Sequence, residues 1–280
     1  MIRQTQTLNS LPLSYLEWGA GDLILLLHGL GDHGGVWQGL APTLADRYHV
    51  IAPDLRGHGD SGKPTHPEAY DSLTLVADLE ALAQAQGWTQ ITVVAHSWAA
   101  KLALLWAQQS SQRVGRLGLV DPFFVNRLPG AFRLTFPLLY RTLPFLKVMG
   151  PFESYPAATA MARTLKQYRG WSALQQAVFK AGMAQKPDGS WGSKFAIAAR
   201  NGVFNDILRR AGLTTEISVP TLLLLPEQGL NRFGWQIEPY KTYLPQLQIQ
   251  TLPGNHWPHL VEPEAFNRVV WDYLDQALRE

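Results

Sequence analysis

The feature that most constrains the fold is an abrupt change of pattern at Ser97. Residues 91–96 form a β-branched, apolar run that predicts a strand, and an alanine-rich, helix-favouring stretch begins directly after the serine. A strand that turns into a helix within one residue places the serine on a sharp, exposed corner at the carboxyl edge of a sheet. The following backbone N–H then points toward a helix start. A nucleophile with an oxyanion donor requires this placement.

The alternation of strand and helix patterns extends over the first 121 residues. It favours an α/β fold with a mostly parallel central sheet flanked by helices on both faces. Two further strands near residues 219–225 and 247–252, and a closing amphipathic helix over 263–278, are expected. The predicted strands of the first part are 11–18, 23–28, 48–53, 91–96 and 114–120, and the predicted helices are 36–46, 73–86 and 98–110.

Residues 122–216 differ from the rest of the chain in pattern and in charge. They show no β-like alternation, and their short helical stretches are interrupted by prolines such as Pro129 and Pro144. This segment holds 13 Lys or Arg and four Asp or Glu, a balance of +9, whereas the whole chain has a net charge of only +2. We therefore predict a mildly acidic core, residues 1–121 and 217–280, interrupted by a basic, aromatic-rich helical insertion.

Composition and the chain start bound the class of protein. A chain of 280 residues that is 46% hydrophobic can bury a substantial core. The absence of cysteine excludes disulfides, iron–sulfur clusters, Cys-ligated zinc and thiol nucleophiles. The first residues lack the apolar core of a signal peptide, and no run of about 18 apolar residues is present. We expect a cytoplasmic protein that is a monomer or a homodimer.

Four segments, in order along the chain, resemble the α/β-hydrolase superfamily. The strand-like run 23–27 leads into residues 28–32, which resemble the family's oxyanion loop, and residues 54–62 resemble its next loop signature. The corner at Ser97 resembles the nucleophile elbow, and residues 253–264 resemble the segment that carries the general-base histidine. The resemblance covers nearly the whole chain. It implies that the basic insertion is a helical cap over the active site.

The elbow departs from the family's G-x-S-x-G pattern. Ala95 and Ala99 replace the two glycines. Both positions demand small side chains because the tight turn brings the two backbones close together, and alanine is the smallest residue after glycine. We expect the elbow to form with some tightening. The competing interpretation is an ordinary buried serine in an inactive protein.

A nucleophilic serine needs a base, and His256 is the best candidate. It follows a predicted strand and a Gly-Asn turn, from which its ring can reach Ser97. A third group must orient the imidazole. The superfamily usually supplies an acid just after the strand that ends at Leu225, but Gly229 stands at that point.

Asp121 is the preferred candidate for the missing acid. It ends the strand after the nucleophile helix, where a branch of the superfamily, including haloalkane dehalogenases and some esterases, places its acid. Neighbouring parallel strands bring their carboxyl ends to one edge, so either strand can serve the same imidazole. Glu227 remains an alternative, as does a triad that is incomplete or assisted by Asn231.

The remaining histidines are assigned other roles. We expect His28, His58 and His96 to position loops or fill the core, and His259 to pack beside the base. His33 lies near the predicted mouth of the active site and is kept as a candidate substrate contact, although a structural role is favoured.

The resemblance also implies the oxyanion hole and part of the pocket wall. The backbone N–H groups of Leu30 and Trp98 are the expected oxyanion donors. Their side chains are free to shape the pocket, and Trp98, Phe123 and Phe124 are candidate substrate contacts. In the 54–62 loop, Asp54, Arg56 and Asp60 are expected to stabilise loops beside the elbow, because the spacing fits neither a phosphate loop nor a metal site. We predict no metal and no organic cofactor.

The bulky side chains of the insertion favour a large apolar acyl, prenyl or aromatic group in the pocket. Residues 131–149 combine apolar bulk with three spaced cations. Such a segment can lie on an anionic membrane surface or pack as a cap helix with solvated arginines, and we favour the second arrangement. The basic charge also suits an anionic substrate. No clustered Lys and Arg interleave with aromatics, so nucleic acid is not an expected partner.

The sequence thus predicts a serine hydrolase that cleaves a small-molecule or lipid-like ester or thioester through an acyl-enzyme. Haloalkane dehalogenase and epoxide hydrolase chemistry are disfavoured, because those relatives carry an aspartate where Ser97 stands. A cofactor-free haloperoxidase or a carbon–carbon bond hydrolase remains possible with the same triad. A binding or receptor-like protein without activity is the other alternative.

Overall fold

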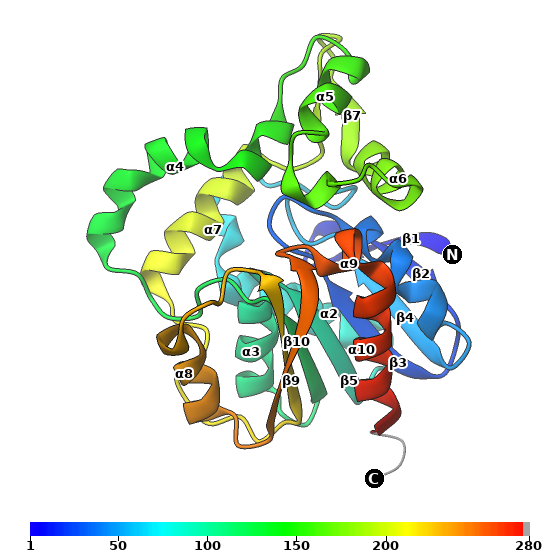
Figure 1. Cartoon of the computed structure of the whole chain (residues 1–280), viewed down its shortest axis with the longest axis vertical. Coiled ribbons are helices and arrows are strands. Elements are labelled where there is room, and N and C mark those ends of the chain that lie inside the picture. Colours follow the sequence, from blue (N-terminus) through cyan, green and yellow to red (C-terminus); the bar gives the residue numbers. More distant parts are fainter. Residues whose placement is uncertain (277–280) are drawn as a thin grey trace.

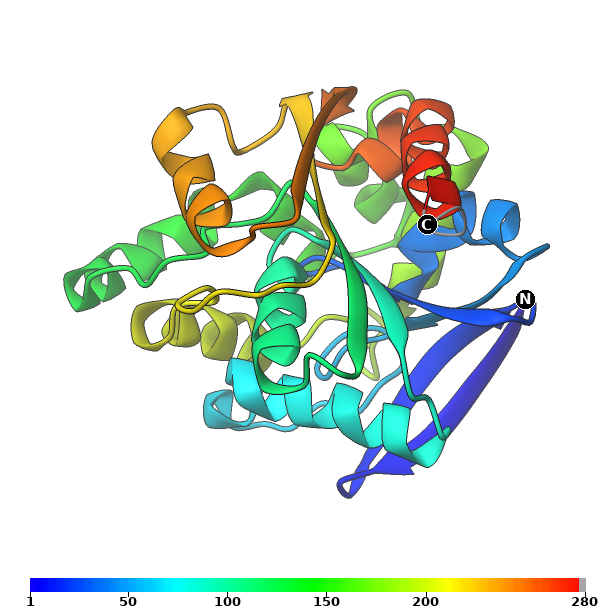
Figure 2. The ribbon, with the colours of Figure 1, turned by 90° about the horizontal axis from the view of Figure 1, so that it is seen from below.

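The computed structural model describes residues 1–276, which form a twisted sheet of eight strands with helices on both faces (Figures 1 and 2). The strand order is β1-β2-β4-β3-β5-β6-β9-β10, and every pairing from β4 to β10 is parallel. The strands are β1 (Ile2–Leu8), β2 (Leu11–Trp18), β3 (Asp22–Leu27), β4 (Tyr48–Pro53), β5 (Ile91–His96), β6 (Val114–Val120), β9 (Thr221–Gln228) and β10 (Leu247–Asn255).

Consecutive residues of the central strands face opposite layers, which explains their continuous apolar runs. Leu25 and Val93 belong to the core beneath one layer of helices, whereas Ile24 and Val94 belong to the core beneath the other. The first layer contains α2 (Ser72–Ala85), α3 (Ala99–Gln109) and α8 (Gly234–Tyr243). The second contains the 3-10 helix η1 (Gly34–Gly39), α1 (Ala41–Leu44), α9 (Pro258–Val261) and α10 (Pro263–Gln276).

The predicted insertion lies over the carboxyl edge of the sheet (Figure 1). Its last helix, α7 (Ile197–Arg209), is tied to the core by a buried ion pair, in which Lys101 Nζ of α3 lies 2.5 Å from Asp206 Oδ2. The Ser72 hydroxyl also donates to Asp206. The insertion contains η3 (Gly130–Thr135), α4 (Phe136–Thr142), η4 (Pro144–Met149), α5 (Tyr155–Ala162), η5 (Lys166–Tyr168), α6 (Ala173–Gly182), β7 (Met183–Gln185), β8 (Trp191–Ser193) and α7 (Ile197–Arg209).

The sequence prediction was incomplete or wrong at several places. Strand β1, helix α8 and the β7–β8 hairpin were not expected, and the hairpin contradicts the prediction of an insertion without strands. The helix expected over residues 36–46 is a 3-10 helix followed by the single turn α1. The last residues of the expected 263–278 helix lie outside the described part. Within residues 1–276, no helix is long and apolar enough to cross a membrane.

Candidate active site

Ser97 occupies a strained corner between β5 and α3. Its φ angle is +57°, in the left-handed region that residues with a Cβ rarely adopt. Ala95 and Ala99 on either side are fully buried, which shows why these positions require small side chains. The opposing loop approaches just as closely, since a Cβ on Gly29 would lie 2.7 Å from His96 Nδ1 and 3.3 Å from Ser97 Cβ.

Three side chains from distant parts of the chain form one hydrogen-bonded line. Ser97 Oγ lies 2.8 Å from His256 Nε2, and His256 Nδ1 lies 2.6 Å from Asp121 Oδ2. A carboxylate accepts the Nδ1 proton, which leaves Nε2 as the acceptor for the serine hydroxyl. The arrangement therefore provides a hydroxyl, a base in the required tautomer, and a group that orients the base.

Asp121 reaches His256 because β5, β6 and β9 lie side by side and end at the same edge. The loop after β9 supplies donors instead of an acid. The Leu230 N–H lies 3.1 and 2.9 Å from the two carboxylate oxygens of Asp121, and Asn231 Nδ2 donates to Oδ1 at 2.9 Å. A Cβ on Gly229 would lie only 2.6 Å from Asp121 Oδ2. The absence of a side chain at Gly229 thus leaves space for the carboxylate of Asp121, which comes from β6 instead of the loop after β9.

The alternative acids are placed differently. Glu227 is exposed on the strand end, and within residues 1–276 it makes no hydrogen bond to His256. Asn231 contacts the carboxylate of Asp121 and the Pro122 carbonyl rather than the imidazole. Of the three candidates, the structure brings only Asp121 into contact with the base.

Two backbone N–H groups beside Ser97 are free to bind an oxyanion. Leu30 and Trp98 both line the cavity in front of the serine. Neither residue is inside a helix or strand, and neither N–H donates to a backbone acceptor among the described residues. Because both N–H groups lie at the cavity and have no backbone acceptor, these two donors are available for a developing negative charge.

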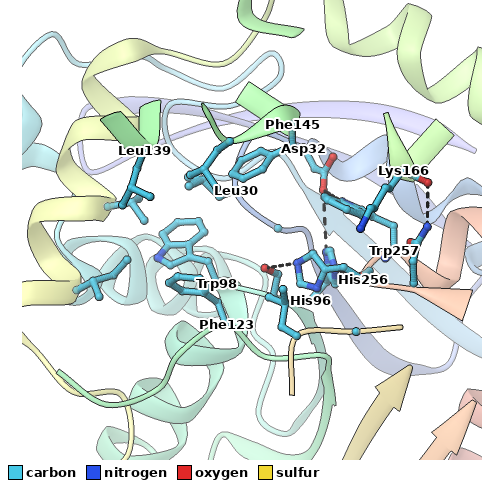
Figure 3. Close-up of a pocket in the computed structure, with 18 of the residues that line it drawn as sticks. Leu30, Asp32, His96, Trp98, Phe123, Leu139, Phe145, Lys166, His256 and Trp257 are labelled. Atoms are coloured by element: carbon cyan, nitrogen blue, oxygen red, sulfur yellow. Dashed lines mark hydrogen bonds and ion pairs between the residues drawn. The ribbon is translucent and has the colours of Figure 1, made fainter. Parts of the chain in front are cut away.

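The cavity over the serine has a volume of about 420 Å³, which is within the range of small-molecule sites. Figure 3 shows Leu30, Leu139 and Trp98 on one side of it and His256, His96 and Lys166 on the other. Its remaining apolar walls come from the insertion and the edge of the sheet. They are Phe123, Leu143, Phe145, Val203, Phe204, Ile207, Leu230 and Trp257.

Comparison with known proteins agrees with this geometry. The family model described as alpha/beta hydrolase fold matches residues 22–263. The chain belongs to this family. Its α/β-hydrolase fold is also found in the crystal structure of E-2-(acetamidomethylene)succinate hydrolase, which superposes with a TM-score of 0.83 at 21% identity, covering 98% of this chain and 99% of the other.

Sequence relatives of this α/β hydrolase have several activities. The soluble epoxide hydrolase of Corynebacterium sp. (strain C12) is 32% identical over 133 residues, which cover 47% of this chain and 44% of that enzyme. The chain therefore spans less than half the length of that relative. The sn-1-specific diacylglycerol lipase ABHD11 of Mus musculus is 29% identical over 286 residues, covering 97% of this chain and 88% of the other.

Two candidate substrate contacts of the hydrolase lie away from the cavity. His33 is buried, where its Nδ1 accepts the Gly35 N–H at the start of η1 and its Nε2 donates to the Val178 carbonyl. Phe124 turns outward, with its ring 6.5 Å from that of Trp235. Trp98 and Phe123 line the cavity as expected. The direction of a loop side chain has no sequence signal, which explains the two misplaced residues.

The other polar groups of the predicted loops form structural contacts. Asp54 accepts the N–H groups of Gly34 and Asp60, and Arg56 forms two 2.7 Å hydrogen bonds with Asp78. The buried His28 accepts the Leu55 N–H, and burial lowers its pKa to about 4.

The sequence prediction missed Asp32, a carboxyl group in the cavity wall. Its side chain is 10% exposed and accepts one hydrogen bond, from Trp257 Nε1 at 3.3 Å. Burial raises the pKa of Asp32 to about 7. His96 donates its Nε2 proton to the His256 carbonyl, so its Nδ1, 4.0 Å from Asp32, carries a lone pair. A protonated Asp32 therefore faces a basic nitrogen, whereas a charged one faces a second acceptor.

Proposed function

We propose that this α/β hydrolase is a serine hydrolase that cleaves an ester or thioester with a bulky apolar acyl, prenyl or aromatic group. The observation that carries the proposal is the 2.8 Å contact between Ser97 Oγ and His256 Nε2 at the wall of an apolar cavity. The name of the mouse relative, a diacylglycerol lipase, supports ester cleavage.

The geometry supports an acyl-enzyme mechanism. Ser97 Oγ attacks the substrate carbonyl carbon while His256 Nε2 takes the hydroxyl proton, and the N–H groups of Leu30 and Trp98 stabilise the oxyanion. Asp121 stabilises the imidazolium. The bond to the leaving alcohol or thiol breaks, and His256 gives this group its proton. A water molecule then adds to the acyl-enzyme with His256 as base, releasing the acid and restoring Ser97.

The chemistry of Ser97 separates the proposal from the activity named for the epoxide hydrolase relatives. Those relatives are expected to use a carboxylate nucleophile, whereas this chain has a hydroxyl that depends on His256 for activation. Ester and thioester carbonyls suit this hydroxyl, because the two free N–H groups stabilise the oxyanion that forms when it adds to them.

A fluorophosphonate probe tests the proposal directly. The folded protein should be labelled at Ser97, and the Ser97→Ala variant should not be labelled. Absence of labelling in the folded wild-type protein would favour a binding protein without hydrolytic activity. A hydrolysis series over acyl chain length, with matched oxygen esters and thioesters, then tests the substrate class. Highest kcat/KM on the shortest acyl chain would contradict the bulky apolar group.

A further inference from the structure

The segment η3–α4 of the insertion exposes large apolar side chains to solvent. Phe132, Leu134 and Leu138 have 45, 86 and 64% of their surface exposed. We call the side that carries Leu134 and Leu138, together with Arg141, the outer face of η3–α4. A cluster of exposed leucine and phenylalanine on one short element marks an interaction site, since isolated domains rarely expose such clusters.

The outer face is one side of a helical segment that is apolar on both sides. Leu134, Leu138 and Arg141 follow the i, i+4, i+7 spacing of one helix face. The opposite side is covered, because Phe136 packs on Phe204 with ring centroids 5.2 Å apart, and Leu139 and Leu143 line the cavity. The sequence analysis favoured internal packing for this segment, and such packing explains only its inner side. The outer side has no partner within residues 1–276.

The charge around the outer face has a single sign. Residues 122–152 contain Arg127, Arg133, Arg141 and Lys147 and no Asp or Glu. All four cations are exposed, and none forms an ion pair with a carboxylate in the described part of the chain. Apolar side chains interleaved with unpaired cations fit the headgroup region of a membrane that contains anionic lipids.

The position of the outer face relates it to the entrance of the cavity. Four lining residues are exposed and mark where the cavity reaches the surface: Lys166, Gln228, Leu230 and Arg232. Phe233 and Trp235, each 62% exposed, follow them at the start of α8. Helices α4 and α8 project from the same end of the molecule in both views (Figures 1 and 2). Exposed apolar groups of α4 and of the start of α8 thus lie at the same end of the molecule, and those of α8 directly follow the entrance residues.

We propose that the outer face of η3–α4 binds the surface of a membrane containing anionic phospholipid. In this orientation the entrance lies near the lipid surface, and an apolar ester can enter the cavity without crossing water. The proposal of a docking surface depends only on the exposed apolar side chains and on the unpaired cations around them. Only the delivery of substrate rests on the function proposed above.

Vesicle sedimentation tests the docking. The wild-type protein is mixed with vesicles of phosphatidylcholine alone, or with vesicles that also contain phosphatidylglycerol. Binding to the anionic vesicles should be about ten-fold tighter or more, because the exposed Lys and Arg side chains are attracted to the anionic headgroups. High salt should reduce this preference. Equal binding to both vesicles, or binding to neither, would overturn the proposal.

Matched variants assign the binding to the outer face. The double substitution Leu134→Ser and Leu138→Ser should weaken binding to anionic vesicles about ten-fold or more, since two apolar side chains lose their burial in lipid. The control is Ile2→Ser on β1, because Ile2 is 60% exposed, close to the 64% of Leu138, and β1 lies at the other end of the molecule (Figure 1). Equal losses in the two variants would overturn the assignment.

Hydrolysis of a water-soluble ester without vesicles separates this proposal from the function itself. The Leu134→Ser, Leu138→Ser protein should retain wild-type turnover, which also verifies its folding. Loss of vesicle binding with unchanged soluble turnover supports the docking face. A wild-type protein that cleaves the ester but binds no vesicles overturns the docking alone. A concentration-dependent dimer abolished by the double substitution, without vesicle binding, would assign the face to a second copy of the chain.

Discussion

Two carboxyl groups near His256 show how differently the same side chain is surrounded in two regions of the molecule. Asp121, at the end of β6, accepts hydrogen bonds from Leu230, Asn231 and His256. Asp32, in the loop after β3, accepts one long bond from Trp257, and burial raises its pKa to about 7. The two carboxyl groups differ in the number of hydrogen-bond donors around them. The first can hold a carboxylate beside an imidazolium, whereas the second favours a neutral acid.

Removing the charge at Asp121 should have the largest effect. Asp121→Asn places an amide against His256 Nδ1 and disturbs its tautomer, so kcat on an ester should fall about ten-thousand-fold. Steady-state kinetics measure this loss. Glu227→Gln is the control and should retain wild-type turnover, because Glu227 is exposed and does not contact the imidazole. A loss of only a few-fold in Asp121→Asn would mean that another group orients the base.

Crowding the same carboxylate should have the next largest effect. The new Cβ of Gly229→Ala would lie 2.6 Å from Asp121 Oδ2 and must displace it, and a displacement of about 1 Å reduces turnover about a hundred-fold. Gly234→Ala provides a matched control at the start of α8, since a Cβ there meets nothing within 4 Å. Similar kcat values in the two variants would show that the position of the carboxylate is not critical.

Removing one donor from Asp121 should have a smaller effect. Asn231→Ala deletes the Nδ2 bonds to Asp121 Oδ1 and the Pro122 carbonyl but keeps the Leu230 N–H. Loss of a hydrogen bond to a charged group corresponds to about ten-fold in kcat. KM should stay near the wild-type value, since Asn231 does not line the cavity. A loss as large as that of Asp121→Asn would make Asn231 essential to the triad.

The smallest effect on turnover, and a measurable effect on stability, is expected at Asp32. Burial raises its pKa from 3.8 to about 7 in the folded state, so the folded protein keeps a proton that the unfolded chain has lost. This contribution to stability is complete below about pH 4 and is lost as the pH rises through about 7. Asp32→Asn should remove this dependence, and the variant should gain at most about 4 kcal/mol relative to wild type between these pH values.

Denaturant unfolding of wild type and Asp32→Asn at a series of pH values measures the difference. Other titrating groups cancel in the comparison, because both proteins contain them. A difference in the free energy of unfolding that is constant from pH 4 to 8 would show that Asp32 titrates normally.

The sequence predicted the central sheet and the meeting of Ser97, His256 and Asp121 because both depend on regular patterns. The buried parallel strands are continuous apolar runs, and the sharp corner at Ser97 follows from the strand-to-helix junction. Parallel strands that end at one edge also made Asp121 a reasonable candidate. Strand β1 was missed because it is an edge strand with little burial on either face, so its residues do not alternate in polarity.

The hairpin and the environment of Asp32 were missed for different reasons. Between β7 and β8, the turn residues Pro187, Asp188 and Gly189 are a recognisable hairpin signal that the sequence analysis overlooked. The burial of Asp32 has no such local signal, because it depends on Trp257 and His96 from other parts of the chain. Such tertiary environments decide a pKa, and a single sequence does not contain them in readable form.

The ion pair between Lys101 and Asp206 has a consequence for how ligands reach the serine. It fastens α7, part of the roof over the cavity, directly to the nucleophile helix, with both side chains almost completely buried. Moving α7 away from α3 would leave two buried charges without a partner, so we expect ligands to enter beside the exposed Leu230. A ligand longer than the cavity would extend out of it beside Leu230. The cavity therefore limits the size of the part of the ligand next to Ser97 and not the ligand's full length.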